Sequence, residues 1–377
     1  MHLVRTRPLL FPALVGLLLI AAFLLGGRTV AFADEGDGGG GFQQTNLASN
    51  LPGVAPVTDP SLLNPWGLVS SSTSPWWVSD NNGGVSTLYS DTNGVFAKVA
   101  LTVTIPAPTG SPAGTMGAPT GVVFNGDSSE FLVPGTTTAS RFIFDTENGT
   151  VLAWGGGAAA TIAVDNSAAG AVYKGLAIAS TTSGDQLYAT NFGQGRVDVF
   201  DSNFAPVTLP AGAFTDPRIP AAYSPFGIAT IGGMLFVTYA IPNGSGDEVL
   251  GQGLGFIDVY SLDGTLLQRF ARHGLLNAPW GMAVAPAGFG QFGGDLLVGN
   301  FGDGHVDAYS MSGELLGPLH AADGRRLTID GLWALAFGND AAAGPASTLF
   351  FTAGPDDQAD GLFGTLTPAP MATGGNH

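Results

Sequence analysis

The sequence predicts an all-β protein, a six-bladed β-propeller with four antiparallel strands in each blade. Three observations support this fold: a short apolar motif recurs six times, glycine-rich turns separate the short apolar runs that follow it, and no segment has sustained helical periodicity. The clearest copy of the motif reads Pro279-Trp280-Gly281-Met282. Taking the glycine as the register mark, with Ala334 in the last copy, places the marks at positions 67, 121, 175, 227, 281 and 334. A repeat of this length suits a four-stranded blade and is long for one coil of a β-helical solenoid, the structural alternative.

One repeat illustrates the four strands. In the fifth repeat, residues 279–284, 295–300, 305–309 and 314–316 are short apolar or alternating runs, and each run is followed by a turn that contains glycine. The third and fourth repeats follow the same order. Such runs predict an antiparallel meander in each repeat.

The two ends of the repeat array complement each other. The last repeat supplies three strands, at residues 333–337, 349–352 and 361–366, and the sequence ends before a fourth. Residues 42–48 precede the first repeat and belong to no other strand. We therefore expect an N-terminal strand to close the last blade, which removes the open seam of the ring.

Residues 1–33 have the features of a signal peptide. Arg5 and Arg7 precede an apolar run at residues 9–25, and Ala31 and Ala33 are small residues that favour cleavage after position 33. The alternative is an uncleaved anchor, but this run is shorter than the ~20 residues of a membrane span. We expect an exported protein, periplasmic or extracellular, with a flexible leader at residues 34–44, the propeller at residues 45–366 and a disordered tail at residues 367–377.

Charge and composition exclude several classes of function. After removal of residues 1–33, nine Lys and Arg stand against 29 Asp and Glu, a formal net charge of −20. Nucleic acids and anionic membranes require a basic surface, so neither is an expected partner. The chain has no cysteine, which excludes thiol catalysis and thiolate metal sites.

Several segments together resemble a known but uncharacterised family of exported bacterial propellers, some of which carry PEP-CTERM sorting tails. They are residues 64–68, 78–81, 299–304, 351–355 and 360–364, and the similarity covers residues 45–366. The blade pattern is also similar to that of NHL-repeat and gluconolactonase-like propellers. The latter resemblance implies a divalent metal held by Glu, Asn and Asp. We interpret Glu130, Glu147, Glu248 and Glu314 as turn, loop or outer-strand residues, so this triad is not expected here.

The candidate ligand-binding residues lie where the repeats predict the mouth of the propeller. Loops that lead into the innermost strands and loops between the second and third strands share one face, and loops on a rigid scaffold commonly carry function. The candidates at this mouth are Asn64, Trp66, Lys174, Phe226, Asn277, Trp280 and Trp333. An aromatic arc opposite polar residues suits a sugar ring or a peptide. The alternative for the aromatic residues is packing between neighbouring blades.

The same loops carry candidate metal ligands. Oxygen ligands for Ca²⁺ are offered by Asp80, Asn191, Asn300, Asp303 and Asp356. The alternative is that Asn and Asp beside glycine form turns. Two long loops, at residues 205–224 and 242–254, are expected at the same mouth as a lid or docking wall, or as tolerated surface insertions.

These features favour a non-enzymatic module that binds a small molecule, a glycan or a protein at the mouth of the propeller, with or without Ca²⁺. A metal-dependent hydrolase of lactonase type is the alternative from another class, and a structural protein of the cell surface or matrix is the third.

Overall fold

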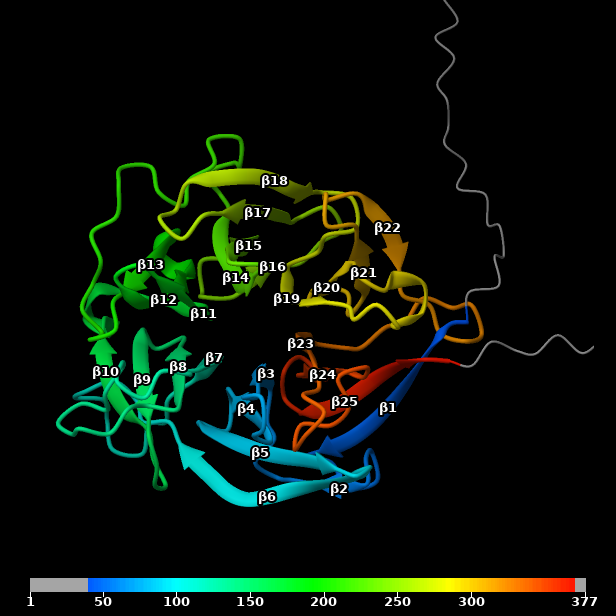
Figure 1. The fold of residues 1–377 in the computed structure, drawn as a ribbon, viewed down its shortest axis with the longest axis horizontal. Helices are drawn as coiled ribbons and strands as arrows, with labels where there is room; N and C mark the ends of the chain where they lie inside the picture. Colours follow the sequence, from blue (N-terminus) through cyan, green and yellow to red (C-terminus); the bar gives the residue numbers. More distant parts are fainter. Residues whose placement is uncertain (1–39, 370–377) are drawn as a thin grey trace, which may run out of the picture. The chain divides into compact units, whose positions relative to one another are not determined.

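The computed structural model describes residues 40–369, and among them it contains strands and short 3₁₀ turns but no α-helix. Six antiparallel sheets stand around one axis, as the repeats predicted (Figure 1). The predicted signal peptide, most of the predicted leader and most of the predicted tail lie outside the described residues. No helix in the described part is long and apolar enough to cross a membrane.

The first three blades, from the innermost strand outwards, contain eleven of the repeat strands. They are β3 (Pro65–Val69), β4 (Trp76–Asp80), β5 (Val85–Thr92) and β6 (Val95–Thr104); β7 (Pro119–Phe124), β8 (Phe142–Thr146), β9 (Thr150–Trp154) and β10 (Thr161–Asp165); β11 (Tyr173–Thr181), β12 (Gly184–Asn191) and β13 (Arg196–Phe200). The third blade therefore has three strands where four were predicted. Residues 205–207 run beside β13 with one bridge between Phe200 and Pro206, and prolines at 206 and 210 cannot donate ladder hydrogen bonds.

The fourth and fifth blades have the predicted four strands, and the fourth also carries the short strand β16 (Glu248–Val249), which pairs with β15. Their strands are β14 (Ser224–Ile231), β15 (Met234–Pro242), β17 (Phe256–Tyr260) and β18 (Leu266–Arg272); β19 (Pro279–Val284), β20 (Leu296–Asn300), β21 (Val306–Tyr309) and β22 (Leu315–Pro318). Three 3₁₀ turns lie in loops, at η1 (Ser167–Ala169), η2 (Phe192–Gln194) and η3 (Gly290–Phe292).

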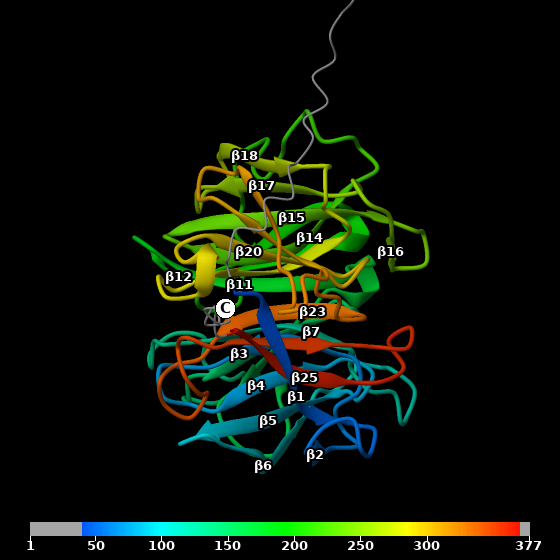
Figure 2. The ribbon, with the colours of Figure 1, turned by 90° about the vertical axis from the view of Figure 1, so that its right-hand side faces the viewer.

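The sixth blade is closed by the N-terminal strand, as predicted. It contains β23 (Leu332–Phe337), β24 (Leu349–Ala353), β25 (Leu362–Pro368) and then β1 (Phe42–Ser49), with β2 (Val57–Thr58) at its edge. β1 pairs antiparallel with β25 from Phe42 opposite Pro368 to Ser49 opposite Leu362, and the two strands lie side by side in both views (Figures 1 and 2). β1 begins three residues before the predicted start of the propeller at 45.

The apolar core is divided into sectors between neighbouring blades. Buried side chains form six clusters, each built from two adjacent blades, and a seventh lies on the axis. Adjacent strand residues point to opposite faces of a sheet, so Trp76 packs on Phe350 of the sixth blade while Trp77 stacks on Phe142 of the second. Each sheet is thus buried on both faces, which accounts for the apolar runs in the repeats.

Candidate functional site in the central channel

The recurring motif forms a β-bulge in every blade. In the fifth blade the pairing of β19 with β20 shifts register between Pro279 and Met282, across Trp280 and Gly281, and the innermost strands of the other five blades shift at the equivalent place. A bulge bends the strand and re-aims a side chain. It turns the residue before the register mark towards the axis of the ring.

The glycine of the motif permits close approach of neighbouring blades. A Cβ at Gly281 would collide with the carbonyl oxygen of Trp333 in the next blade, and one at Gly227 would collide with the carbonyl oxygen of Trp280. The innermost strands therefore meet backbone to backbone around the channel. This contact explains why five of the six copies of the motif carry glycine at the register mark.

Aromatic side chains from several blades fill the end of the channel at which the innermost strands begin. We name Trp66, Phe226, Trp280, Trp333 and Phe301 the axial aromatic cluster. Trp66 and Trp333 stack with ring centroids 3.5 Å apart, Phe301 stacks on the other side of Trp333 at 4.0 Å, and Trp280 meets both tryptophans edge-on at 6.0 and 5.7 Å. The cluster closes the channel where the sequence predicted an open mouth.

The predicted ligand-binding residues are therefore buried rather than displayed. Trp66, Phe226 and Trp333 are at most 1% exposed and Trp280 is 9% exposed, and they pack on one another rather than between blades. The two predicted asparagines are also buried and bonded within the protein. Asn64 accepts from Trp333 Nε1 at 2.9 Å, and Asn277 accepts from the backbone N–H of Gly251 at 2.6 Å.

Lys174 lies at the same end of the channel and is 1% exposed. Its Nζ is 2.5 Å from Glu147 Oε1 and 3.7 Å from Glu248 Oε2, and lies over the Trp66 ring at 4.7 Å from the centroid. Burial opposes the ammonium charge, but the two carboxylates outweigh it and raise the pKa of Lys174. For Glu248, burial is the main cause of a pKa raised to about 7, and the nearby charges of Glu147 and Asp247 add to it.

Glu147 lies in a turn and Glu248 in the loop at residues 242–254, in line with their interpretation from the sequence, but neither was among the predicted mouth residues and both reach Lys174. Glu147 directly follows β8 and also accepts from Asn81 Nδ2 at 2.9 Å, while Glu248 is carried to Lys174 by β16 in the loop at residues 242–254. The end of β8 pairs with the start of β7, so the residue after it lies beside the axis. In the sequence, the position of Glu147 beside the axis could have been predicted from the end of the second strand of its repeat. The spacing from the glycine of the motif does not predict it.

The candidate metal ligands do not converge. Asn191 donates to Asp198 at 2.8 Å and Asn300 to Asp307 at 2.7 Å, each within its own blade. Asp303 accepts from Asn277, Asp80 accepts from the backbone N–H of Thr87 inside the first blade, and Asp356 is exposed in the loop after β24. Within residues 40–369 no three His, Asp or Glu side chains form a group that could hold a metal ion.

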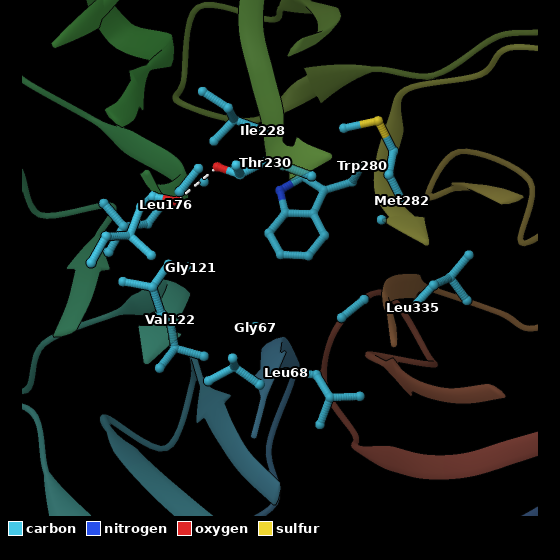
Figure 3. A pocket seen from close by; sticks show the side chains of 18 of the residues that line it. Gly67, Leu68, Gly121, Val122, Leu176, Ile228, Thr230, Trp280, Met282 and Leu335 are labelled. Atoms are coloured by element: carbon cyan, nitrogen blue, oxygen red, sulfur yellow. Dashed lines mark hydrogen bonds between the residues drawn. The ribbon is translucent and has the colours of Figure 1, made fainter. Parts of the chain in front are cut away.

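A cavity of about 420 Å³ occupies the channel beyond the axial aromatic cluster. It follows the innermost strands from their glycines towards their ends, and Trp280 contributes the largest side chain of its wall (Figure 3). Its lining contains no titratable side chain; the side-chain hydroxyls come from Ser70 and Thr230, and Thr230 donates to the carbonyl of Ile178 at 2.8 Å. The innermost strands have no further strand on their axial side, so alternate backbone N–H and C=O groups face the cavity.

Comparison with solved structures identifies the fold class of the protein. A streptogramin B lyase structure matches with a TM-score of 0.51 at 12% identity, covering 87% of this chain and 97% of that one, and at this identity the likeness shows the propeller fold alone. No family model matches the chain.

Relatives in sequence identify the family. Uncharacterized protein R648 of Acanthamoeba polyphaga mimivirus is 34% identical over 335 residues, covering 85% of this chain and 78% of that protein. Uncharacterized protein L690 of the same virus is 33% identical over 332 residues, covering 85% and 84%. The chain belongs to the family of these two proteins. These relatives are viral, so they lend no support to the bacterial family or the PEP-CTERM kinship expected from the motifs.

Proposed function

We propose that this protein is an exported binding module that holds an uncharged ligand, carbohydrate-like in chemistry, in the cavity of its central channel. The observation that carries the proposal is the lining of that cavity: backbone N–H and C=O groups, two hydroxyls and an indole, without a titratable side chain. Backbone amides and carbonyls offer the donors and acceptors that sugar hydroxyls need, and an indole offers an apolar surface for a sugar ring. A volume of about 420 Å³ lies within the range of small-molecule sites.

The binding end of the channel differs from the one expected. The predicted mouth is closed by the axial aromatic cluster and by Lys174 with its two carboxylates. The cavity lies on the other side of that cluster, and Trp280 belongs to both. Trp280 is fixed there because its Nε1 donates to the backbone carbonyl of Lys174 at 2.7 Å.

A hydrolase of lactonase type has less support. General acid–base or metal-assisted hydrolysis needs titratable or metal-bound groups beside the substrate. The cavity lining has none, and the candidate Ca²⁺ ligands are separated and bonded within their blades. The proposal therefore includes no calcium ion.

Export is part of the proposal and rests on the sequence of residues 1–33. The check is to express the full chain in a secreting host and sequence the protein that leaves the cytoplasm. A mature N-terminus at Asp34 supports the proposal. Retention of residues 1–33 on a membrane-bound product would contradict it.

The ligand is tested with a printed array of neutral and acidic glycans, followed by calorimetry with the best neutral binder. Trp280→Phe keeps an aromatic ring in the axial aromatic cluster but removes the indole from the cavity wall, and it should weaken binding by about tenfold. Trp154→Phe is the matched control, because Trp154 is also 9% exposed but packs between the first and second blades. An array without neutral binders, or equal loss in both variants, would overturn the proposal.

A further inference from the structure

A second hollow lies away from the channel, at the outer part of the fourth blade. It is a groove of about 460 Å³, bounded by residues 216–219, by β17 and β18 with the turn at residues 273–275, and by Tyr309, Gly313 and Leu315 of the fifth blade. The loop at residues 205–224 was expected at the mouth of the propeller. Its Asp216 instead bonds to Arg269 on the outer strand β18, so this part of the loop lies at the periphery.

Basic residues gather in this groove. Arg218, Arg269 and Arg272 line it, three of the nine Lys and Arg that follow residue 33, and His273 joins them. The protein as a whole is strongly acidic, with 29 Asp and Glu. This local reversal of charge is a property of one groove rather than of the whole surface.

The carboxylates of the groove are buried while its cations are exposed. Asp216 and Asp258 are 7% and 2% exposed, whereas Arg218 and Arg272 lie at the surface. Burial opposes ionisation of Asp216, but hydrogen bonds from Arg269 and from the backbone N–H of Arg218 outweigh it and lower its pKa. Burial and the charge of Asp216 raise the pKa of Asp258 to about 6. The groove therefore presents positive charge to solvent.

Arg269 is held in place, and two other arginines remain open to a ligand. Arg269 binds Asp216 in a fork, with Nε at 2.5 Å from Oδ2 and Nη2 at 2.7 Å from Oδ1. Among the described residues, no carboxylate lies within ion-pair distance of Arg218 or Arg272. An arginine fork suits carboxylate and phosphate oxygens.

His273 is fixed at the rim of the groove in an uncommon conformation. Its φ is +54°, which is uncommon for a residue other than glycine, and its ring meets Phe256 edge-on at 4.7 Å. Nδ1 lies 2.8 Å from the carbonyl oxygen of Gly253, which can only accept, so Nδ1 carries the hydrogen. Nε2 is left as the nitrogen that can contact a ligand.

The remaining wall is apolar. Phe256, Phe270, Ile219, Leu275 and Leu315 contribute to it. We propose that this groove binds a small organic anion, a carboxylate or phosphate monoester with an apolar or aromatic body, with Arg218 and Arg272 on the anionic group. The site is independent of the cavity in the central channel.

The test is calorimetry on the folded protein at low salt with three probes: 1-naphthoate, the neutral analogue 1-naphthalenemethanol, and inorganic phosphate. We expect one molecule of naphthoate to bind per chain and the neutral analogue to bind about tenfold more weakly or worse. Binding of phosphate as well would assign a phosphate monoester as the physiological class; without it, the class is the carboxylate. Added salt should weaken binding, since exposed charges are screened.

Two double variants locate the site. Arg218→Gln with Arg272→Gln should weaken naphthoate binding by about tenfold or more. Arg325→Gln with Arg326→Gln removes the same charge from exposed positions outside the groove and should leave binding unchanged. Trp280→Phe should also leave it unchanged, which separates this groove from the channel. Absence of saturable binding at about 1 mM naphthoate, or equal loss in both double variants at unchanged melting temperature, would overturn the proposal.

Discussion

Trp66 and Trp333 stack face to face at 3.5 Å between ring centroids, although 267 positions separate them in the chain. Trp66 lies on the innermost strand of the first blade and Trp333 on that of the sixth. The ring is thus joined twice, by this stack at the axis and by β1 on β25 at the outside. The inner joint is aromatic and the outer joint is a strand ladder, so the two can be tested separately.

The inner joint predicts a large loss of stability on truncation. Trp333→Ala removes a fully buried ring that also contacts Trp280, Phe226 and Phe301, and should lower the free energy of unfolding by about 3–5 kcal/mol. Urea unfolding followed by circular dichroism measures this. A loss below about 1 kcal/mol would show that the stack does not hold the ring.

The outer joint predicts that the ring opens without its first strand. A chain beginning at residue 51 lacks β1, exposes the ladder edge of β25 and should lose its cooperative unfolding transition. A synthetic peptide of residues 40–50 should restore the transition by binding to β25. A peptide with Pro at positions 44 and 46 is the control, since proline cannot donate to the ladder.

The repeats were sufficient to predict the ring, because a bulge recurs in the innermost strand of every blade and carries a small residue where neighbouring blades meet backbone to backbone. Gly227 and Gly281 mark such contacts, and Ala334 holds the same position in the sixth blade. The N-terminal closing strand followed from counting strands. The missing strand of the third blade was not foreseen, because it depends on how residues 205–210 leave β13 rather than on the motif.

The candidate site was harder to predict than the fold. The motif showed that an aromatic residue precedes the glycine, but not that the bulge turns it inward to meet its counterparts from other blades. Glu147 was not among the predicted mouth residues because the hairpin between β7 and β8 is long. Glu147 therefore lies more positions after Gly121 in the chain than Asn81 lies after Gly67. Glu147 follows β8, whose end pairs with Pro119, and Asn81 follows β4, whose end pairs with Pro65. The two residues therefore occupy equivalent places in neighbouring blades.

Close contact between blades predicts a steric effect of a single methyl group. Gly281→Ala places a Cβ against the carbonyl of Trp333 and should cost about 1–3 kcal/mol of stability. Gly288→Ala is the matched control, because nothing lies within 4 Å of its Cβ and its φ is not positive. Equal melting temperatures for the two variants would contradict the backbone contact.

Buried carboxylates predict a protein that loses stability as pH rises through the weakly acidic range. Burial is the main cause that raises the pKa of Asp145 to about 7, from a model-compound value of 3.8. Between these two values the folded state keeps a proton that the unfolded state has lost, so stability falls with increasing pH across this window and levels off above it. Glu248, with a pKa raised to about 7, and Asp307, raised to about 6, act in the same direction. Thermal unfolding should therefore give a higher melting temperature at about pH 5 than at about pH 8.

Asp145→Asn isolates one of these groups. The Asp145 Oδ1 atom accepts from Thr120 Oγ1 at 2.8 Å and from the backbone N–H of Gly121 at 2.6 Å, and an asparagine oxygen can accept both bonds. The other oxygen, Oδ2, is buried without a hydrogen-bond partner, so no hydrogen bond at that atom stabilises the ionised carboxylate. The variant cannot ionise, and its melting temperature should fall less between about pH 5 and pH 8 than that of the parent protein. Asp127→Asn, at a position exposed to solvent, is the control and should keep the full slope. If Asp145→Asn also keeps the full slope, Asp145 is ionised in the folded protein throughout this range and the assignment is wrong.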